Sequence, residues 1–243
     1  MTYYHEEAAL YVTEKISLDQ NKKTIFLVGD SIRMGYCGYT KEYLKDVADV
    51  AYPDDNCRYT QYTYVGLSQW KNIFPDPSAV DCVYWNNGHW DIAHWDNEPE
   101  SLNSINDYCE MLVRIYEKIK RLFPNAKIVF GTTLPMNPNG MDWMNQRTTE
   151  EIRAYNQAAI EALTHKDIYI DDAFALFEDK PSSYFIDYCH LTEEGFEILG
   201  KHVGDYIMRL FDESKTERLL FMQTLCYFII GVFAITKGTT ESA

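Results

Sequence analysis

The sequence is poor in basic side chains. Its 243 residues include 22 Lys and Arg against 37 Asp and Glu, which gives a formal net charge of −15. Binding of nucleic acid needs clustered Lys and Arg, and no such cluster occurs in the sequence. We therefore exclude nucleic acid as a partner. Apolar residues make up 46% of the chain, which predicts a folded core rather than a disordered chain.

The sequence also lacks paired cysteines. Its six cysteines contain no C-x-x-C pair, so neither a zinc knuckle nor a thioredoxin-like motif is indicated. The first residues, MTYYHEEAALYVTEKI, carry acidic side chains where a signal peptide has a basic region and then an apolar run. We therefore expect a protein with free thiols in the reducing cytoplasm.

One short apolar run ends in three polar or small residues. Residues 24–28, TIFLV, are apolar or β-branched without alternation, which is typical of a strand buried on both faces of a parallel sheet. Gly29, Asp30 and Ser31 then end the run. Ligands of open α/β sheets bind at the carboxyl ends of the strands, where Ser31 would lie. Ser31 is therefore either a nucleophile or the cap of the next helix.

Strands of this kind alternate with helices along most of the chain. We predict strands at residues 24–28, 48–52, 81–87, 126–134 and 167–174, and helices at residues 32–47, 67–73, 102–123, 149–164 and 192–211. Thr148 and Glu151 form a capping-box pattern at the start of the fourth helix. This alternation predicts an α/β fold with three layers, α/β/α, around a central parallel sheet of about five strands.

The length fits one α/β domain with an appendage. We assign residues 1–21 to an N-terminal helical extension, residues 22–212 to the main domain, and residues 213–243 to a C-terminal tail. Residues 219–236 carry no charge, and as a helix they would span about 27 Å, close to the ~30 Å hydrocarbon core of a bilayer.

We expect residues 219–236 to form a C-terminal hydrophobic helix that anchors the chain in a membrane. The alternatives are a helix packed on the domain and an apolar surface buried by self-association. Basic residues precede this segment at Arg209, Lys215 and Arg218, whereas one, Lys237, follows it. The positive-inside tendency therefore places the main domain in the cytoplasm.

Three polar clusters follow predicted strands or precede the last helix: Gly29–Ser31, Asn86–Asp91 and Asp187–Thr192. A serine nucleophile needs a base that removes its proton and a carboxylate that orients the base. Asp187 and His190 are three positions apart, so one turn of chain can direct both side chains toward Ser31.

Attack on a carbonyl group also needs donors for the negative oxygen that forms. The backbone N–H groups of Ser31 and Gly66 are candidates for this oxyanion hole, and we predict Gly66 in a loop before the helix at 67–73. The side-chain amide of Asn86 or of Asn87 is a further candidate.

These motifs resemble those of the SGNH (GDSL-type) hydrolases. The Gly-Asp-Ser turn after the first strand is similar to the nucleophile block of that family, and Asp187 and His190 before LTEEGFEILG are similar to its last block. The resemblance covers roughly residues 22–210. It implies a flavodoxin-like fold and a Ser31–His190–Asp187 catalytic triad, and it implies no cofactor or metal.

The middle block departs from the usual G-x-N-D pattern of that family. Its sequence here is N-N-G-H-W-D, which looks more like the N-x-G-H-W block of the plant polysaccharide O-acetyltransferase and esterase branch. That similarity implies Asn86 as the oxyanion residue, with Asn87 as the rival. Gly66 is the best match to the glycine block of the family.

Other residues near these blocks are candidates for substrate binding. His89 and Trp90 line a substrate wall or pack inside the domain, and Arg33 contacts substrate or forms a surface salt bridge. His89, Asp91 and His94 are of types that bind zinc, but the sequence supplies no further ligand. We therefore expect no metal.

The resemblance implies a serine esterase that forms an acyl-enzyme. We expect an O-acyl ester as substrate, and specifically an O-acetyl ester on a carbohydrate or glycan, because of the middle block and because aromatic residues make up 15% of the chain. An O-acyltransferase that uses the same acyl-enzyme to modify a glycan is one alternative. A non-catalytic glycan-binding domain is another. The sequence leaves the oligomeric state open.

Overall fold

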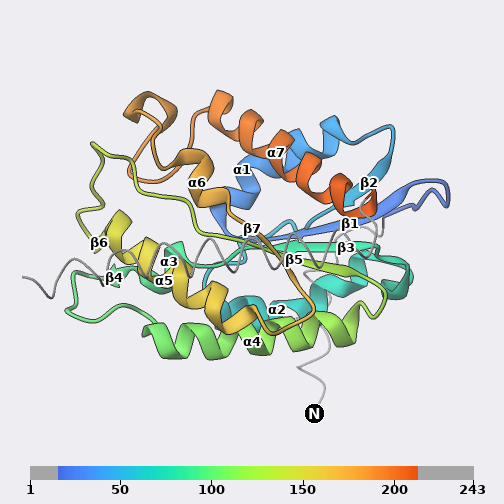
Figure 1. Ribbon diagram of the computed structural model, residues 1–243, viewed down its shortest axis with the longest axis horizontal. Coiled ribbons are helices and arrows are strands. Elements are labelled where there is room, and N and C mark those ends of the chain that lie inside the picture. Colours follow the sequence, from blue (N-terminus) through green and yellow to red (C-terminus); the bar gives the residue numbers. More distant parts are fainter. Residues whose placement is uncertain (1–15, 213–243) are drawn as a thin grey trace, which may run out of the picture. The chain divides into compact units, whose positions relative to one another are not determined.

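The computed structural model describes residues 16–212 and contains the three-layer α/β/α arrangement that the sequence predicted (Figure 1). Its central sheet has five parallel strands in the order β2-β1-β3-β5-β7. The strands are β1 (Lys23–Val28), β2 (Ala48–Ala51), β3 (Cys82–Trp85), β5 (Lys127–Gly131) and β7 (Tyr169–Asp171). This order is that of the flavodoxin-like doubly wound sheets.

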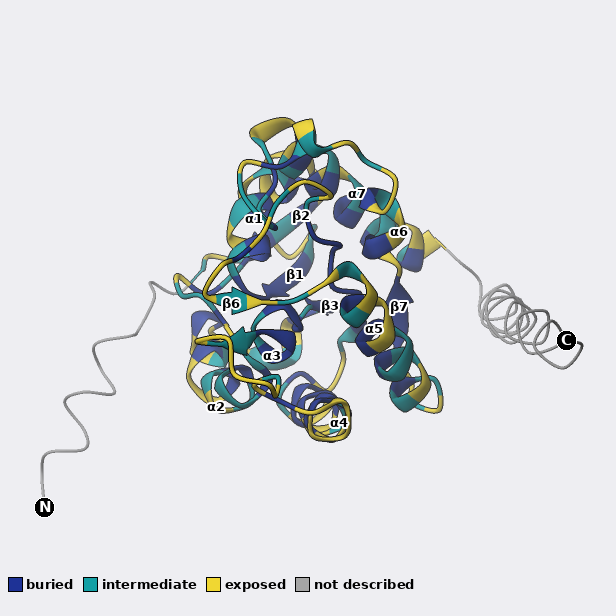
Figure 2. Cartoon of the chain, turned by 90° about the vertical axis from the view of Figure 1, so that its left-hand side faces the viewer, coloured by how far each residue is buried: buried dark blue, intermediate teal, exposed yellow. Residues whose placement is uncertain are grey.

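Helices cover both faces of the sheet (Figures 1 and 2). One face is covered by α1 (Ser31–Tyr43) and by residues 193–204 of α7 (Glu193–Asp212), and the other by α2 (Thr60–Trp70), α4 (Ile105–Leu122) and α5 (Thr149–Leu163). The chain divides into two units, residues 1–204 and 205–243. The whole sheet belongs to the first unit.

The sequence patterns explain the main elements. Residues 24–28 of β1 are buried, as expected for a central strand. The buried side chains of α4 recur every three or four residues and face the core. The capping box at the start of α5 is confirmed, because Thr148 and Glu151 each accept a hydrogen bond from the other's backbone N–H.

The structure corrects the prediction for the segment before β3. Gly66 lies inside α2, which begins at Thr60, and not in a loop before a helix at 67–73. The buried face of α2 includes two threonines, Thr60 and Thr63, along with Leu67 and Trp70. Because half of this face is not strongly apolar, hydrophobic spacing did not reveal the first two turns of the helix.

Several short elements were not predicted. They are α3 (His89–Ile92), α6 (Ala173–Phe177), the strands β4 (His94–Trp95) and β6 (Asn145–Gln146), which pair antiparallel, and two 3₁₀ segments, Pro77–Ala79 and Ser182–Tyr184, whereas a third 3₁₀ segment, Lys71–Ile73, falls inside the helix predicted at residues 67–73. Each is too short to show a period in the sequence.

The predictions for the two ends of the chain fall mostly outside the described residues. Residues 16–21 are not helical, and the rest of the expected N-terminal helix, residues 1–15, is not described. The expected membrane segment at 219–236 is likewise not described. Between residues 16 and 212, the structure has no helix with the length and apolar character needed to cross a bilayer.

The strand order determines where a ligand site can form. Strand β1 pairs with β2 on one side and with β3 on the other. The chain therefore runs outward from β1 to β2, crosses back to β3, and then adds strands in the opposite direction. A crevice forms at the carboxyl ends of the strands where the winding reverses in this way. The Gly-Asp-Ser turn follows β1 and the N-N-G-H-W-D segment follows β3, so both polar clusters lie at this edge.

Candidate active site

The turn after β1 places Ser31 at the amino-terminal end of α1. Asp30, and not Ser31, caps this helix, because Oδ1 of Asp30 accepts a hydrogen bond of 3.0 Å from the backbone N–H of Ile32. Ser31 is the first residue of the helix. The interpretation of Ser31 as a cap is therefore wrong, and its hydroxyl is free to take another partner.

That partner is His190. Oγ of Ser31 lies 2.7 Å from Nε2 of His190, although the two residues are 159 positions apart. Nδ1 of the same ring lies 2.7 Å from Oδ2 of Asp187. These two contacts form the series of hydrogen bonds that links a serine nucleophile to its base and the base to an orienting carboxylate.

Hydrogen bonds favour the charged form of Asp187. Its partial burial favours the neutral carboxyl group, but the backbone N–H groups of Cys189 and His190 donate to Oδ1 at 2.9 and 2.8 Å, and the His190 ring bonds Oδ2. These bonds outweigh the burial and hold the pKa of Asp187 below its usual value. A carboxylate here can stabilise the imidazolium that forms when His190 accepts a proton.

A second loop holds the Asp187–His190 turn in place. The side-chain amide of Asn137 donates to the backbone carbonyl of Asp187 at 2.8 Å, and the backbone N–H of Asn137 donates to the carbonyl of Tyr188 at 2.9 Å. No sequence motif singles out Asn137. Residues 135–147 are rich in Pro and Asn, which indicates a loop but not this contact.

Two hydrogen-bond donors belong to the Gly-Asp-Ser turn or contact it. The backbone N–H of Ser31, at the start of α1, has no acceptor among residues 16–212 and lies at the positive end of the helix dipole. Asn86 Nδ2 donates to Asp30 Oδ1 at 3.3 Å, and a side-chain amide has a second hydrogen to donate. The structure therefore brings Asn86 beside the Gly-Asp-Ser turn.

Asn87, the rival to Asn86, is used elsewhere. Its Nδ2 donates to the carbonyl oxygen of Arg58 at 2.8 Å and to Oγ1 of Thr63 at 2.9 Å, so both hydrogens have acceptors. The residue is completely buried. Asn87 thus ties the end of β3 to α2 and to the loop before it, and it has no hydrogen left for an oxyanion.

Gly66 does not fit the role predicted for its backbone N–H. It is the seventh residue of α2, beyond the first turn, so its N–H is committed to the hydrogen-bond ladder of the helix. A Cβ atom at Gly66 would lie 2.3 Å from the indole of Trp70, which explains the glycine by packing. The oxyanion assignment of Gly66 is therefore wrong.

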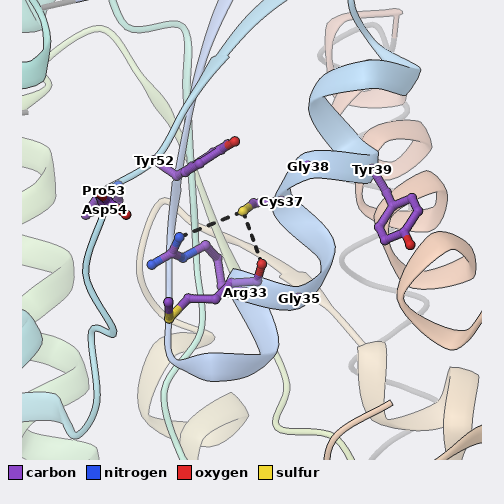
Figure 3. Close-up of a pocket in the computed structure, with 9 residues that line it drawn as sticks. Arg33, Gly35, Cys37, Gly38, Tyr39, Tyr52, Pro53 and Asp54 are labelled. Atoms are coloured by element: carbon purple, nitrogen blue, oxygen red, sulfur yellow. Dashed lines mark hydrogen bonds between the residues drawn. The ribbon is translucent and has the colours of Figure 1, made fainter. Parts of the chain in front are cut away.

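Arg33 is buried and holds the loop that follows β2. Its side chain is 2% exposed, and it donates to the carbonyl oxygens of Gly29 and Asp55 and to Sγ of Cys37. No carboxylate within residues 16–212 is in ion-pair contact with it, so the alternative of a surface salt bridge is wrong. Arg33 also lines a pocket of about 360 Å³ beside Tyr52, as Figure 3 shows. Contact with substrate stays a prediction.

His89 and Trp90 begin the short helix α3. His89 is 4% exposed, and burial, together with the charges of Arg147 and His190, lowers its pKa well below the usual value, so its ring is neutral. Trp90 is half-buried and its ring centroid lies 5.0 Å from that of Trp95. His89 therefore faces the interior, whereas Trp90 keeps an accessible surface.

The structure does not bring His89, Asp91 and His94 together as a metal site. Within residues 16–212, the ligand atoms that come within 4.8 Å of one another belong to Asp187, Cys189 and His190. Burial raises the pKa of the Cys189 thiol to about 12, which makes it a poor ligand, and His190 Nδ1 is bonded to Asp187. The arrangement fits proton transfer better than metal binding.

Arg58, which sequence reasoning missed, lies at the same edge in a rare backbone conformation. Its φ angle is +49°, in the left-handed region, and its neighbour Cys57 donates a backbone hydrogen bond of 3.1 Å to the carbonyl of Gly29. The exposed Arg58 guanidinium lies over the rings of Tyr62 and Trp90, at 4.6 and 6.0 Å from their centroids. No sequence motif reports such a backbone conformation.

Comparison with known proteins agrees with this geometry. Residues 27–198 match the model of the GDSL-like Lipase/Acylhydrolase family. No curated protein matches the sequence. A lipase/acylhydrolase from Enterococcus faecalis has a similar structure, with a TM-score of 0.58 and 18% identity over 76% of this chain and 95% of its own.

Two carbohydrate-active enzymes also share the fold. A carbohydrate esterase of family 3 from Talaromyces cellulolyticus has a TM-score of 0.58 and 13% identity, over 79% of this chain and 100% of its own. An acetylxylan esterase from Geobacillus stearothermophilus has a TM-score of 0.58 and 14% identity, over 75% and 94% of the two chains. At these identities the structural similarity establishes only that the fold is shared. Membership of the family rests on the match to the family model.

Proposed function

Because the chain belongs to the GDSL-like lipase/acylhydrolase family, whose members hydrolyse esters, we propose that Ser31 is its nucleophile, with His190 as the base and Asp187 as the orienting carboxylate. The observation that carries this proposal is the chain of two 2.7 Å contacts, Ser31 Oγ to His190 Nε2 and His190 Nδ1 to Asp187 Oδ2.

The first half of the reaction forms an acyl-enzyme. His190 Nε2 takes the proton of the Ser31 hydroxyl as Oγ attacks the carbonyl carbon of the ester. The backbone N–H of Ser31 and the Asn86 amide donate to the negative oxygen of the tetrahedral intermediate. His190 then gives its proton to the leaving alcohol oxygen as the bond between carbon and that oxygen breaks.

The second half of the reaction uses water. His190 takes a proton from a water molecule as the water oxygen attacks the acyl carbon. The bond to Ser31 Oγ breaks, the proton returns to that oxygen, and a carboxylic acid leaves. Asp187 stays ionised throughout and stabilises the imidazolium, in agreement with the lowered pKa of its carboxyl group.

The substrate that we propose is an O-acetyl ester on a carbohydrate. Two proteins of the same fold are described as a carbohydrate esterase and an acetylxylan esterase. In this chain, Trp90 keeps an accessible surface, and Trp143 is 74% exposed in the loop whose Asn137 contacts the Asp187–His190 turn. Exposed aromatic side chains of this kind mark binding surfaces.

Replacement of Ser31 tests the mechanism. We expect Ser31→Ala to reduce hydrolysis of 4-nitrophenyl acetate to the uncatalysed rate, with an unchanged unfolding transition. Ser68→Ala is the matched control, because Ser68 is an exposed serine on α2. Retained hydrolysis in Ser31→Ala would exclude this mechanism.

A second assay tests the substrate class. Acetylated xylan and peracetylated monosaccharides are compared with 4-nitrophenyl esters of longer acyl chains, and we expect release of acetate from the sugars. The same assay includes a free glycan acceptor. Acetylated acceptor in place of free acetate would identify the chain as an acyltransferase.

A further inference from the structure

Residues that carry buried polar atoms without hydrogen-bond partners line one small cavity at the end of β3. The cavity has a volume of about 10 Å³. Three of the residues that line it, Tyr36, Asn86 and His89, each have a buried polar atom that is unpaired within residues 16–212. Folded proteins pair nearly all such atoms, so four of them on three residues around one cavity require an explanation.

The unpaired atoms come from three different elements. They are the hydroxyl of Tyr36 on α1, Oδ1 of Asn86 after β3, and the ring nitrogens of His89 at the start of α3. Other polar side chains of the same wall are already paired. Tyr84 O–H donates to Asp171 at 2.9 Å, and Thr133 O–H donates to the carbonyl of Asn87 at 3.0 Å.

The protonation states of the three groups are complementary. Burial raises the pKa of Tyr36 well above its usual value, so its hydroxyl is a donor. Burial lowers the pKa of His89, so its ring is neutral and one nitrogen is an acceptor. Asn86 Oδ1 is an acceptor. A ligand that accepts one hydrogen bond and donates two would give each of the three residues a partner, with the N–H of the His89 ring left outside this set.

The size and polarity of the cavity select water. One water molecule needs roughly 10–15 Å³ of such volume and typically makes about three hydrogen bonds. An acyl methyl group would fit the same volume. It would leave all of these polar atoms unpaired, however, at a cost of about 1–3 kcal/mol each.

We propose that one buried water molecule accepts a hydrogen bond from Tyr36, donates to Asn86 Oδ1 and to His89, and so holds the Asn86 amide with Nδ2 toward the reaction centre. This inference rests on the proposed function, because it makes Tyr36 and His89 positioning residues for an oxyanion donor. The orientation of the amide matters, since a rotated Asn86 would place Oδ1 against the Asp30 carboxyl that Nδ2 now contacts at 3.3 Å.

A double-mutant cycle tests this link. Tyr36→Phe removes the hydroxyl and keeps the ring. We expect it to lower kcat on 4-nitrophenyl acetate about tenfold with KM unchanged, and to lower it less than about twofold when Asn86→Ala is already present. The matched control is Tyr84→Phe, which removes a hydroxyl from the same wall that bonds Asp171 instead. It is expected to lower stability and leave kcat unchanged.

The outcomes separate this inference from the proposed function. An equal loss of kcat from Tyr36→Phe in both backgrounds overturns the inference, and so does an Asn86→Ala variant with full kcat, because no donor would then need positioning. The proposed nucleophile is judged by Ser31→Ala alone. If Ser31→Ala is inactive and the cycle shows no coupling between Tyr36 and Asn86, the water site is refuted and the proposed function is retained.

A crystal structure of the unmodified protein at atomic resolution gives a second test that needs no variant. We expect one ordered water within hydrogen-bond distance of the Tyr36 hydroxyl, Asn86 Oδ1 and one nitrogen of His89. An empty cavity overturns the inference. So does an acyl group of a bound ester analogue in place of the water.

Discussion

Gly29 and Asn86 approach each other so closely that no side chain fits between them. A Cβ atom on Gly29 would lie 2.2 Å from Oδ1 of Asn86 and 2.7 Å from Cβ of Arg33. Gly29 belongs to the turn that carries Ser31, and Asn86 follows the neighbouring strand β3. The missing side chain therefore allows the proposed nucleophile, Ser31, and the proposed oxyanion donor, Asn86, to share one edge of the sheet.

Gly29→Ala is expected to displace Asn86. Oδ1 of Asn86 has to move away from the new methyl group, and overpacking of this kind costs about 1–3 kcal/mol of folding free energy. We expect a fall in kcat on 4-nitrophenyl acetate together with a lower urea midpoint. The control is Gly38→Ala on α1, where a Cβ atom meets nothing within 4 Å. Alanine there should raise stability by up to about 1 kcal/mol.

Asn86 and Asn87 are expected to respond differently to the same substitution. Asn86→Ala should reduce kcat about 10²–10³-fold, as the loss of one oxyanion donor does, with a small effect on stability. Asn87→Ala leaves the carbonyl of Arg58 and the hydroxyl of Thr63 without their donor and should cost about 1–3 kcal/mol of stability. Steady-state kinetics and urea unfolding of both variants give the comparison. A larger loss of kcat in Asn87→Ala would reverse the assignment.

The parts of the site that sequence alone could predict depend on local patterns. The buried run of β1 placed Ser31 at the carboxyl edge of the sheet, and the spacing of three residues paired Asp187 with His190. Both features are set within a few residues of chain. The five strands were predicted for the same reason, because each is a short apolar run bounded by turns.

The features that sequence reasoning missed depend on distant contacts. Asn86 and Asn87 are neighbours of the same type, and the acceptors that occupy Asn87 come from Arg58 and Thr63. Gly66 was assigned to a loop because threonines supply half of the buried face of α2. Such contacts produce no periodic pattern in the sequence, so the proposed oxyanion donors are harder to predict than the proposed triad of Ser31, His190 and Asp187.

Substitutions at Arg58 are expected to reveal the free energy that its left-handed backbone conformation costs the folded protein. Arg58→Ala and Arg58→Gly remove the same guanidinium, but only glycine adopts a φ angle near +49° without strain. Because that strain is roughly 1–2 kcal/mol for other residues, the glycine variant should be the more stable of the two by about 1 kcal/mol. Urea unfolding of both variants measures the difference. Equal stability, or a more stable alanine variant, would contradict the conformation.

Asp91 is expected to make stability depend on pH. It is completely buried, and Oδ1 accepts hydrogen bonds from the backbone N–H and hydroxyl of Thr60 and from the Asn103 amide. Burial raises its pKa to about 6 despite these bonds. A carboxyl group with a higher pKa in the folded state binds its proton more tightly there, so its stabilising contribution is full below the unfolded pKa and is lost as the pH rises through about 6.

Asp91→Asn isolates this contribution, because the amide oxygen keeps the acceptor that Thr60 and Asn103 use and cannot ionise. Between pH 4 and pH 7, the free energy of unfolding of the unmodified protein should fall relative to Asp91→Asn by about 2 kcal/mol. Urea unfolding at several pH values measures this difference. Asp76→Asn is the control of opposite sign, because hydrogen bonds from Ser78 lower the pKa of this exposed residue. A difference between the unmodified protein and Asp91→Asn that does not change with pH would mean that Asp91 ionises in the folded protein as easily as in the unfolded chain.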